Sequence, residues 1–133
     1  MKKLILCFCL IVVIFSSATY YKRYKNNTPT IEISTSTKFS QDEIQQAIDC
    51  VQTNFSFPAC TLTKLWYDEA KSNELITLNS MDTENSIMIF SNFDVDGSGD
   101  NPVLTPNSTY TNYMWFLIRE DTNSDWTIDH FGL

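Results

Sequence analysis

An apolar run near the N-terminus constrains this chain most, because it limits the part that is free to fold as a compact domain. Lys2 and Lys3 precede an unbroken apolar run, Leu4–Phe15, and the small residues Ser16–Ala18 follow. A basic start, an apolar middle and small residues at the end are typical of a secretory signal peptide. We therefore expect residues 1–21 to direct export of the chain, with cleavage before Thr19.

An uncleaved N-terminal membrane anchor is the alternative for the same segment. The uncharged stretch Leu4–Tyr21 reaches the lower length limit for a membrane-spanning helix. Positive charge tends to stay on the cytoplasmic side of a membrane. Here basic residues flank the stretch on both sides, with Lys22, Arg23 and Lys25 after it, which complicates the anchor interpretation. Under either reading the protein is secreted or held on the extracellular side, and it meets the membrane through this segment only.

The remainder of the chain divides into a short polar stretch and one domain. Residues 22–38 are polar and lack an apolar period, which predicts a flexible linker. Residues 39–133 are enough for one compact domain. Residues 26–133 hold four basic and sixteen acidic residues, a formal charge of −12. A domain this acidic repels phosphate backbones, so we expect no nucleic-acid partner.

One helix can be predicted from its start signal. Ser40 followed by Glu43 forms a capping-box pattern, and Phe39 with Ile44 forms a hydrophobic staple. Apolar residues then recur at helical spacing on one side until Pro58 ends the segment: Ile44, Ala47, Ile48, Val51 and Phe55.

Four strands and a weaker helix are expected in the rest of the domain. Alternating apolar and β-branched residues predict strands over 60–67, 86–95, 110–120 and 126–131. Residues 68–85 mix helix-favouring and turn-favouring residues, so we expect a short or irregular helix there. The pattern indicates an α+β domain in which a helix packs on a curved antiparallel sheet of about four strands.

Several blocks of the chain carry a resemblance to a known group. These blocks are Phe39-Ser40, residues 60–69, residues 91–96, residues 106–115 and residues 125–132. Together they resemble small exported domains of unknown function from gut Firmicutes, whose fold is similar to the cone-shaped NTF2-like group. The resemblance covers residues 39–133 and implies an NTF2-like fold and a place in the cell envelope of a Gram-positive bacterium. It implies no reaction, because that group hosts enzymes, binders and structural modules.

Cys50 and Cys60 are the two cysteines beyond the leader. The end of the predicted helix and the start of the next strand can approach each other, and exported pairs of this kind usually form a disulfide. We therefore predict a Cys50–Cys60 bridge. Two half-buried free thiols are the alternative.

Asp94, Asp96, Ser98 and Asp100 resemble the first half of an EF-hand calcium loop, in which oxygen ligands alternate along the chain. The second half departs from that pattern, because Thr105 stands where the bidentate carboxylate belongs. The favoured interpretation is a polar loop that uses Asp and Gly for its turns. A weak extracellular calcium site is the alternative, and we expect no other cofactor.

Large aromatic side chains are frequent for so small a domain, and they fit either a core or the lining of a pocket. They are Trp66, Trp115, Trp126, Tyr67, Tyr110 and Tyr113. His130 is the single histidine, and no nucleophile–histidine pair can be assigned. Asp68, Asp129 and Tyr67 are the residues that could supply an acid–base pair inside a cone.

These observations favour a non-catalytic module that binds a small ligand or an envelope protein through the concave face of its sheet. A small NTF2-like enzyme of the isomerase or dehydratase type is the main alternative. A calcium-dependent module is the other.

Overall fold

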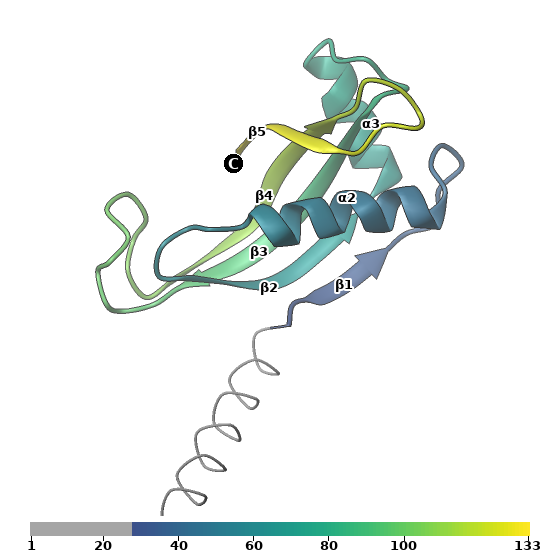
Figure 1. Ribbon diagram of the computed structural model, residues 1–133. Helices are drawn as coiled ribbons and strands as arrows, with labels where there is room; N and C mark the ends of the chain where they lie inside the picture. The colour runs from purple at the N-terminus through teal and green to yellow at the C-terminus, as the bar shows by residue number, and fades with distance from the viewer. Residues whose placement is uncertain (1–27) are drawn as a thin grey trace, which may run out of the picture.

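The computed structural model describes residues 28–133, so the predicted signal peptide or anchor at residues 1–21 lies outside the described part. The domain is α+β, with two helices and one five-stranded sheet (Figure 1). In chain order its elements are β1 (Thr30–Ile33), α2 (Gln41–Asn54), β2 (Cys60–Tyr67), α3 (Glu69–Leu78), β3 (Ser86–Val95), β4 (Ser108–Ile118) and β5 (Thr127–Gly132).

Helix α2 begins where the capping-box pattern predicts. The Ser40 hydroxyl accepts a hydrogen bond from the Glu43 backbone N–H at 3.2 Å, and the Glu43 carboxylate accepts one from the Ser40 N–H at 2.8 Å. These two bonds satisfy amides that the first helical turn leaves without intrahelical partners. The apolar stripe of the helix is buried against the sheet through Ile44, Ala47, Ile48 and Val51.

The sheet follows chain order, β1-β2-β3-β4-β5. Strands β2 to β5 pair antiparallel in sequence, as predicted, with bulges in β2, β3–β4 and β4–β5. The prediction of a purely antiparallel sheet of about four strands is wrong at one edge. There β1 adds a fifth strand parallel to β2, with Ile31 beside Leu65 and Ile33 beside Tyr67.

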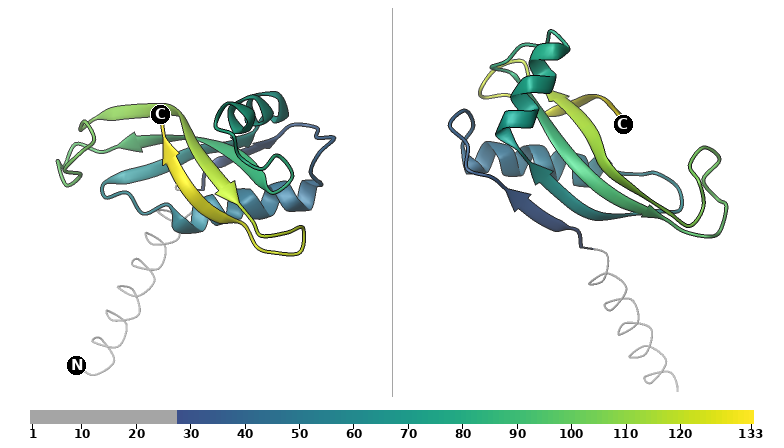
Figure 2. Two further views of the ribbon diagram at one scale, coloured as in Figure 1. Left: turned by 90° about the horizontal axis from the view of Figure 1, so that it is seen from above. Right: turned by 180° about the vertical axis from the view of Figure 1, so that it is seen from behind.

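The two faces of the sheet are covered unequally. Helix α2 lies across one face, which we call the inner face, and the main core fills the space between them. Helix α3 packs on the opposite, outer face at one end of the sheet (Figure 2). Its cluster is small and centres on Met88, Phe90 and Phe116. The other end of the inner face extends beyond α2, and the connection from α2 to β2 passes over it.

Part of the predicted flexible linker belongs to the fold. Beyond strand β1, the turn that follows it wraps around the carboxylate of Glu69 at the start of α3. Thr37 donates to this carboxylate from its backbone N–H at 2.8 Å and from its hydroxyl at 2.7 Å, and the Ser36 hydroxyl donates as well. These donors lower the pKa of Glu69 to about 2, with the Ser36 hydroxyl as the largest cause. Residues 30–38 are therefore held by specific bonds.

An ion pair joins the last part of the chain to the start of α2. The Arg119 guanidinium donates to the Glu43 carboxylate at 2.8 Å, and the Arg119 side chain is only 4% exposed. Trp126 lies over the guanidinium at 4.4 Å, and its indole N–H donates to the Glu43 carbonyl at 3.0 Å.

Within residues 28–133, neither helix has the length and hydrophobicity that crossing a membrane requires.

Candidate functional site

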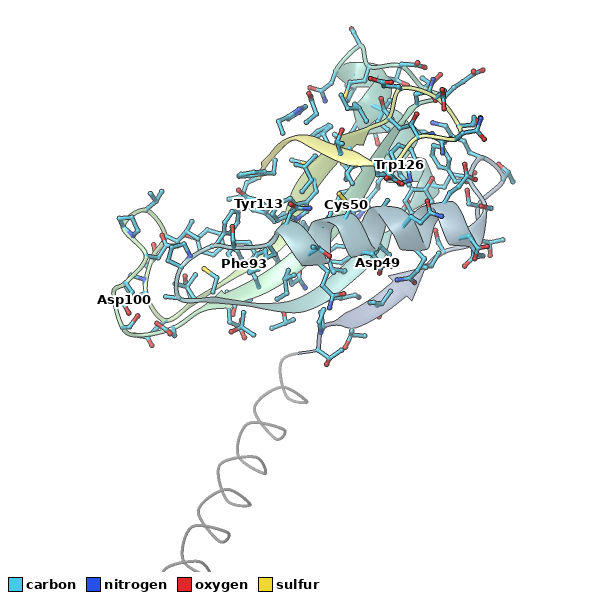
Figure 3. The ribbon with its side chains drawn as sticks, viewed as in Figure 1. Asp49, Cys50, Phe93, Asp100, Tyr113 and Trp126 are labelled. Carbon is cyan, nitrogen blue, oxygen red and sulfur yellow. The ribbon has the colours of Figure 1, made fainter. Side chains whose placement is uncertain are left out.

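An apolar pocket of about 310 Å³ lies at the end of the inner face that α2 leaves uncovered. Three parts of the chain form its walls: the α2–β2 connection, the loop between β3 and β4, and the neighbouring strands β4 and β5. Figure 3 shows Tyr113 of β4 near the end of α2 and Asp100 on the β3–β4 loop further out. The lining residues are Phe57, Pro58, Asn101, Pro102, Val103, Leu104, Tyr113 and Phe131.

Aromatic rings make the floor of the pocket rigid. Phe57 stacks on Trp115, with ring centroids 5.6 Å apart, and it contacts Phe131 at 5.4 Å and Tyr113 at 5.8 Å. Trp115 is 1% exposed, and its indole N–H donates to the buried Ser91 hydroxyl at 2.8 Å. Since a buried indole N–H needs a partner, this bond holds the ring that supports the pocket.

Asn101 fixes the loop wall against the opposite wall. Its side-chain oxygen accepts hydrogen bonds from the backbone N–H groups of Val103 at 3.0 Å and Leu104 at 2.8 Å. Its amide nitrogen donates to the Pro58 carbonyl at 2.9 Å. One side chain, itself buried, therefore sets both the shape of the loop and its distance from the α2–β2 connection.

The pocket is uncharged at neutral pH. Tyr113 is its only titratable lining residue, and burial raises the pKa of its hydroxyl above the ordinary value. Val103 is 86% exposed and Phe131 is 49% exposed, so an apolar rim surrounds the opening. Exposed apolar surface beside a preformed apolar hollow is typical of a binding site.

No disulfide joins Cys50 and Cys60 in the structure. Both are free and half-buried, so the predicted Cys50–Cys60 disulfide is absent. The Cys50 thiol lies against the Trp126 carbonyl at 3.3 Å, beside a more polar hollow along α2, whereas the Cys60 thiol lies against the Pro58 carbonyl at 3.3 Å. Burial raises the pKa of both thiols, which keeps them protonated at neutral pH.

Three of the calcium candidates, Asp94, Asp96 and Ser98, use their side chains in hydrogen bonds within the loop or across the sheet. Asp96 accepts hydrogen bonds from the Ser98 backbone N–H at 2.9 Å and from the Ser98 hydroxyl at 2.5 Å, as in an Asx turn. The Ser98 hydroxyl in turn accepts from the Asp100 N–H at 3.1 Å. Asp94 accepts from the Thr109 hydroxyl across the sheet at 2.7 Å. Among residues 28–133, no three acidic, histidine or cysteine side chains are grouped as metal ligands.

The acid–base candidates are dispersed. Tyr67 is 1% exposed within the main core. Asp68 caps α3 by accepting from the Lys71 N–H at 3.0 Å. His130 stacks on Phe116 at 4.1 Å and bonds Asp129 at 2.7 Å; both side chains are about half exposed. None of these residues lines the apolar pocket.

The large aromatic residues divide between core and pocket. Trp115, Trp126 and Tyr67 are buried, whereas Trp66 lies on the outer face and stacks on Phe90. Tyr113 lines the pocket, and Tyr110 stacks on Phe93 beside it. The remaining aromatic pocket residues, Phe57 and Phe131, are sites that the sequence analysis did not identify. A signal was present in Pro102-Val103-Leu104, an apolar triplet inside an otherwise polar loop.

The chain matches no protein-family model, no curated protein and no solved structure.

Proposed function

We propose that this protein is an exported, non-catalytic binding module of the cell envelope and that the apolar pocket is its binding site. The observation that carries this proposal is the lining of the pocket, which consists of aromatic and aliphatic side chains and one amide, that of Asn101, without a carboxylate, histidine, lysine or arginine. General acid–base catalysis needs such groups within hydrogen-bonding reach of the substrate. A rigid apolar hollow with a single fixed amide is suited to recognition.

The inner face of the sheet also supports a non-catalytic role. In an enzyme of the NTF2-like type, the acid–base residues would have to face an open, water-filled cone. Here Phe39, Phe55, Phe57, Phe93 and Trp115 pack together along that face. We propose an NTF2-like relationship for the fold on the basis of the helix held against consecutive antiparallel strands, with α3 on the outer face as a departure.

A small aromatic probe tests the pocket directly. We expect p-cresol to cause saturable shifts in the amide resonances of Val103, Leu104, Tyr113 and Phe131 in a ¹⁵N-labelled sample. For a ligand of about eight heavy atoms at about 0.5 kcal/mol each, the dissociation constant is about 1 mM. Shifts that do not saturate, or that cluster around Asp129 and His130, would contradict the proposal.

A matched pair of variants locates the binding. Phe131→Ala removes a half-exposed wall of the pocket, so we expect p-cresol affinity to fall about tenfold, which corresponds to the loss of about 1.4 kcal/mol of apolar contact. Leu78→Ala removes a 71% exposed apolar side chain from α3, which does not line the pocket, and should leave affinity unchanged. Equal losses in both variants would place the binding elsewhere.

N-terminal sequencing of the exported protein tests cleavage before Thr19.

A further inference from the structure

Three aromatic rings of the pocket lie close enough together to act on one ligand group. Phe57, Tyr113 and Phe131 line the pocket, and their ring centroids are 5.4, 5.8 and 6.2 Å apart. None of the three side chains is fully buried. An aromatic ring attracts a cation that lies within about 6 Å of its centroid. With centroids this close, one positive group above the three rings can meet that distance for all of them.

The chain's own cations lie on other rings. Residues 28–133 hold four basic side chains, and three of them lie over aromatic rings outside the pocket. The contacts are Lys38 over Phe39 at 4.8 Å, Lys64 over Trp66 at 5.1 Å and Arg119 over Trp126 at 4.4 Å. The fourth, Lys71, belongs to α3 on the outer face. Within the described part of the chain, the pocket rings therefore carry no cation, and one that binds them would come from a ligand.

The charge around the pocket is negative. Asp96 and Asp100 are exposed in the β3–β4 loop, which provides one wall, and neither forms an ion pair among residues 28–133. No lysine or arginine occurs between Lys71 and Arg119, a stretch that contains this loop and all of β4. Such a surface attracts cations and repels anions. A phosphate or carboxylate would also find no lysine or arginine in the lining.

The hydrogen-bonding groups of the lining select the kind of cation. A primary ammonium carries three N–H donors, which need acceptors when they leave water. The lining holds no carboxylate, and the Asn101 side-chain oxygen already accepts hydrogen bonds from the Val103 and Leu104 amides. A quaternary ammonium has no N–H group and presents only carbon-bound hydrogens. It can therefore enter an apolar pocket without leaving a donor unsatisfied.

We propose, as a refinement that rests on the pocket function above, that the natural ligand is a small cation with a trimethylammonium group, which lies on Phe57, Tyr113 and Phe131. A pocket of about 310 Å³ suits a compound of the size of choline. Trimethylammonium groups also occur in lipid head groups, where a phosphate adjoins the cation. Because the acidic loop repels that phosphate, the site takes the free monocation.

Choline and its neutral carbon isostere test the charge at constant shape. The isostere is an alcohol with a tert-butyl group in place of the trimethylammonium group. Attraction to one partly exposed ring corresponds to about two- to fivefold in affinity, and loss of water from the cation offsets part of the sum over three rings. In titrations followed at the Val103, Leu104, Tyr113 and Phe131 amides, we therefore expect choline to bind about fivefold more tightly than the alcohol. Equal or tighter binding of the alcohol would overturn the inference.

A matched pair of ring variants locates the preference. Phe131→Leu removes a half-exposed ring but keeps an apolar wall, so the ratio of choline affinity to alcohol affinity should fall about threefold. Trp66→Leu removes a half-buried ring from the outer face and should leave the ratio unchanged. A ratio that is unchanged in Phe131→Leu, or that falls equally in both variants, would show that the pocket rings do not bind the cation.

Phosphocholine separates the free cation from a lipid head group. It keeps the trimethylammonium group and adds the phosphate, so we expect its affinity to be about fivefold lower than that of choline. Binding as tight as that of choline, or tighter, would overturn the selectivity for a monocation and would assign the site to a head group.

The outcomes separate this inference from the pocket function. If p-cresol binds the pocket but choline binds no more tightly than the alcohol, the cation site is wrong and the pocket function stands. Choline shifts that cluster away from the pocket residues overturn the inference in the same way. If p-cresol, choline and the alcohol all leave the pocket residues unperturbed, both proposals are wrong.

Discussion

Replacing Asn101 by alanine should loosen the β3–β4 loop while leaving the sheet intact. Besides a weak contact with the Cys60 sulfur at 3.7 Å, the substitution removes three hydrogen bonds to oxygen acceptors: those from the Val103 and Leu104 amides and the one to the Pro58 carbonyl. Each contributes about 0.5–1.5 kcal/mol, and the lower half of that range applies because the released groups lie near solvent. The free energy of opening the loop should therefore fall by about 1.5–3 kcal/mol.

Hydrogen exchange measures this loss residue by residue. A change of about 1.4 kcal/mol is tenfold in an equilibrium constant, so exchange at Val103 and Leu104 should accelerate about ten- to a hundredfold. Amides in the centre of β3 should exchange as before, because the loop lies at the edge of the core. We also expect weaker p-cresol binding, since the wall that Asn101 holds would no longer be fixed.

Two further variants decide whether the reasoning is right. Asn101→Asp keeps oxygen acceptors for both loop amides but cannot donate to Pro58, so those amides should stay protected while the pocket widens. Asn123→Ala removes an exposed asparagine from the β4–β5 turn and should change neither measurement. Exchange at Val103 and Leu104 that stays within twofold of wild type in Asn101→Ala would refute the role assigned to Asn101.

Two other predictions concern stability. Glu43→Gln should lower the free energy of unfolding in urea by about 2 kcal/mol, because it leaves Arg119 buried without its carboxylate. This value lies between those for exposed and buried ion pairs. The control Glu120→Gln removes one exposed charge, and an equal loss of stability there would contradict the role of the Glu43–Arg119 pair. The pKa of Glu69 is about 2 in the folded protein, below its ordinary value of 4.5, so its contribution to stability is present above pH 4.5 and is lost as the pH falls toward 2. The difference in urea midpoint between wild type and Glu69→Gln should therefore shrink across that range, and a constant difference would show that the Ser36 turn does not depend on the charge.

Much of the fold could be predicted because its signals are local. The Ser40–Glu43 capping box and the apolar stripe after it depend on residues a few positions apart, and strands β2 and β3 have the predicted bounds. Strand β1 was missed because four residues in a polar stretch give too short a period to recognise. Its strand state depends on β2, which lies more than 30 positions further along the chain.

The pocket could not be predicted in the same way. Its walls come from three separated segments, and the hydrogen bond from Asn101 to Pro58 spans 43 positions. In the sequence the β3–β4 loop has the oxygen-rich pattern of a metal loop, whereas in the structure Asp96 bonds Ser98 and the apolar part of the loop lines the pocket. Composition shows which residues a loop contains, but the side to which each one faces depends on contacts with the rest of the chain.

The agreement between strand order and chain order has a consequence for how the protein acquires its fold. When the chain emerges with its N-terminus first, each new strand can pair with the strand before it. No strand then has to be inserted between two that have already paired. The contacts of Arg119 and Trp126 with Glu43 are formed only when the last part of the chain arrives. The cap of helix α2 involves only neighbouring residues and can form early. Its contacts with Arg119 and Trp126 form only after the end of the chain has folded.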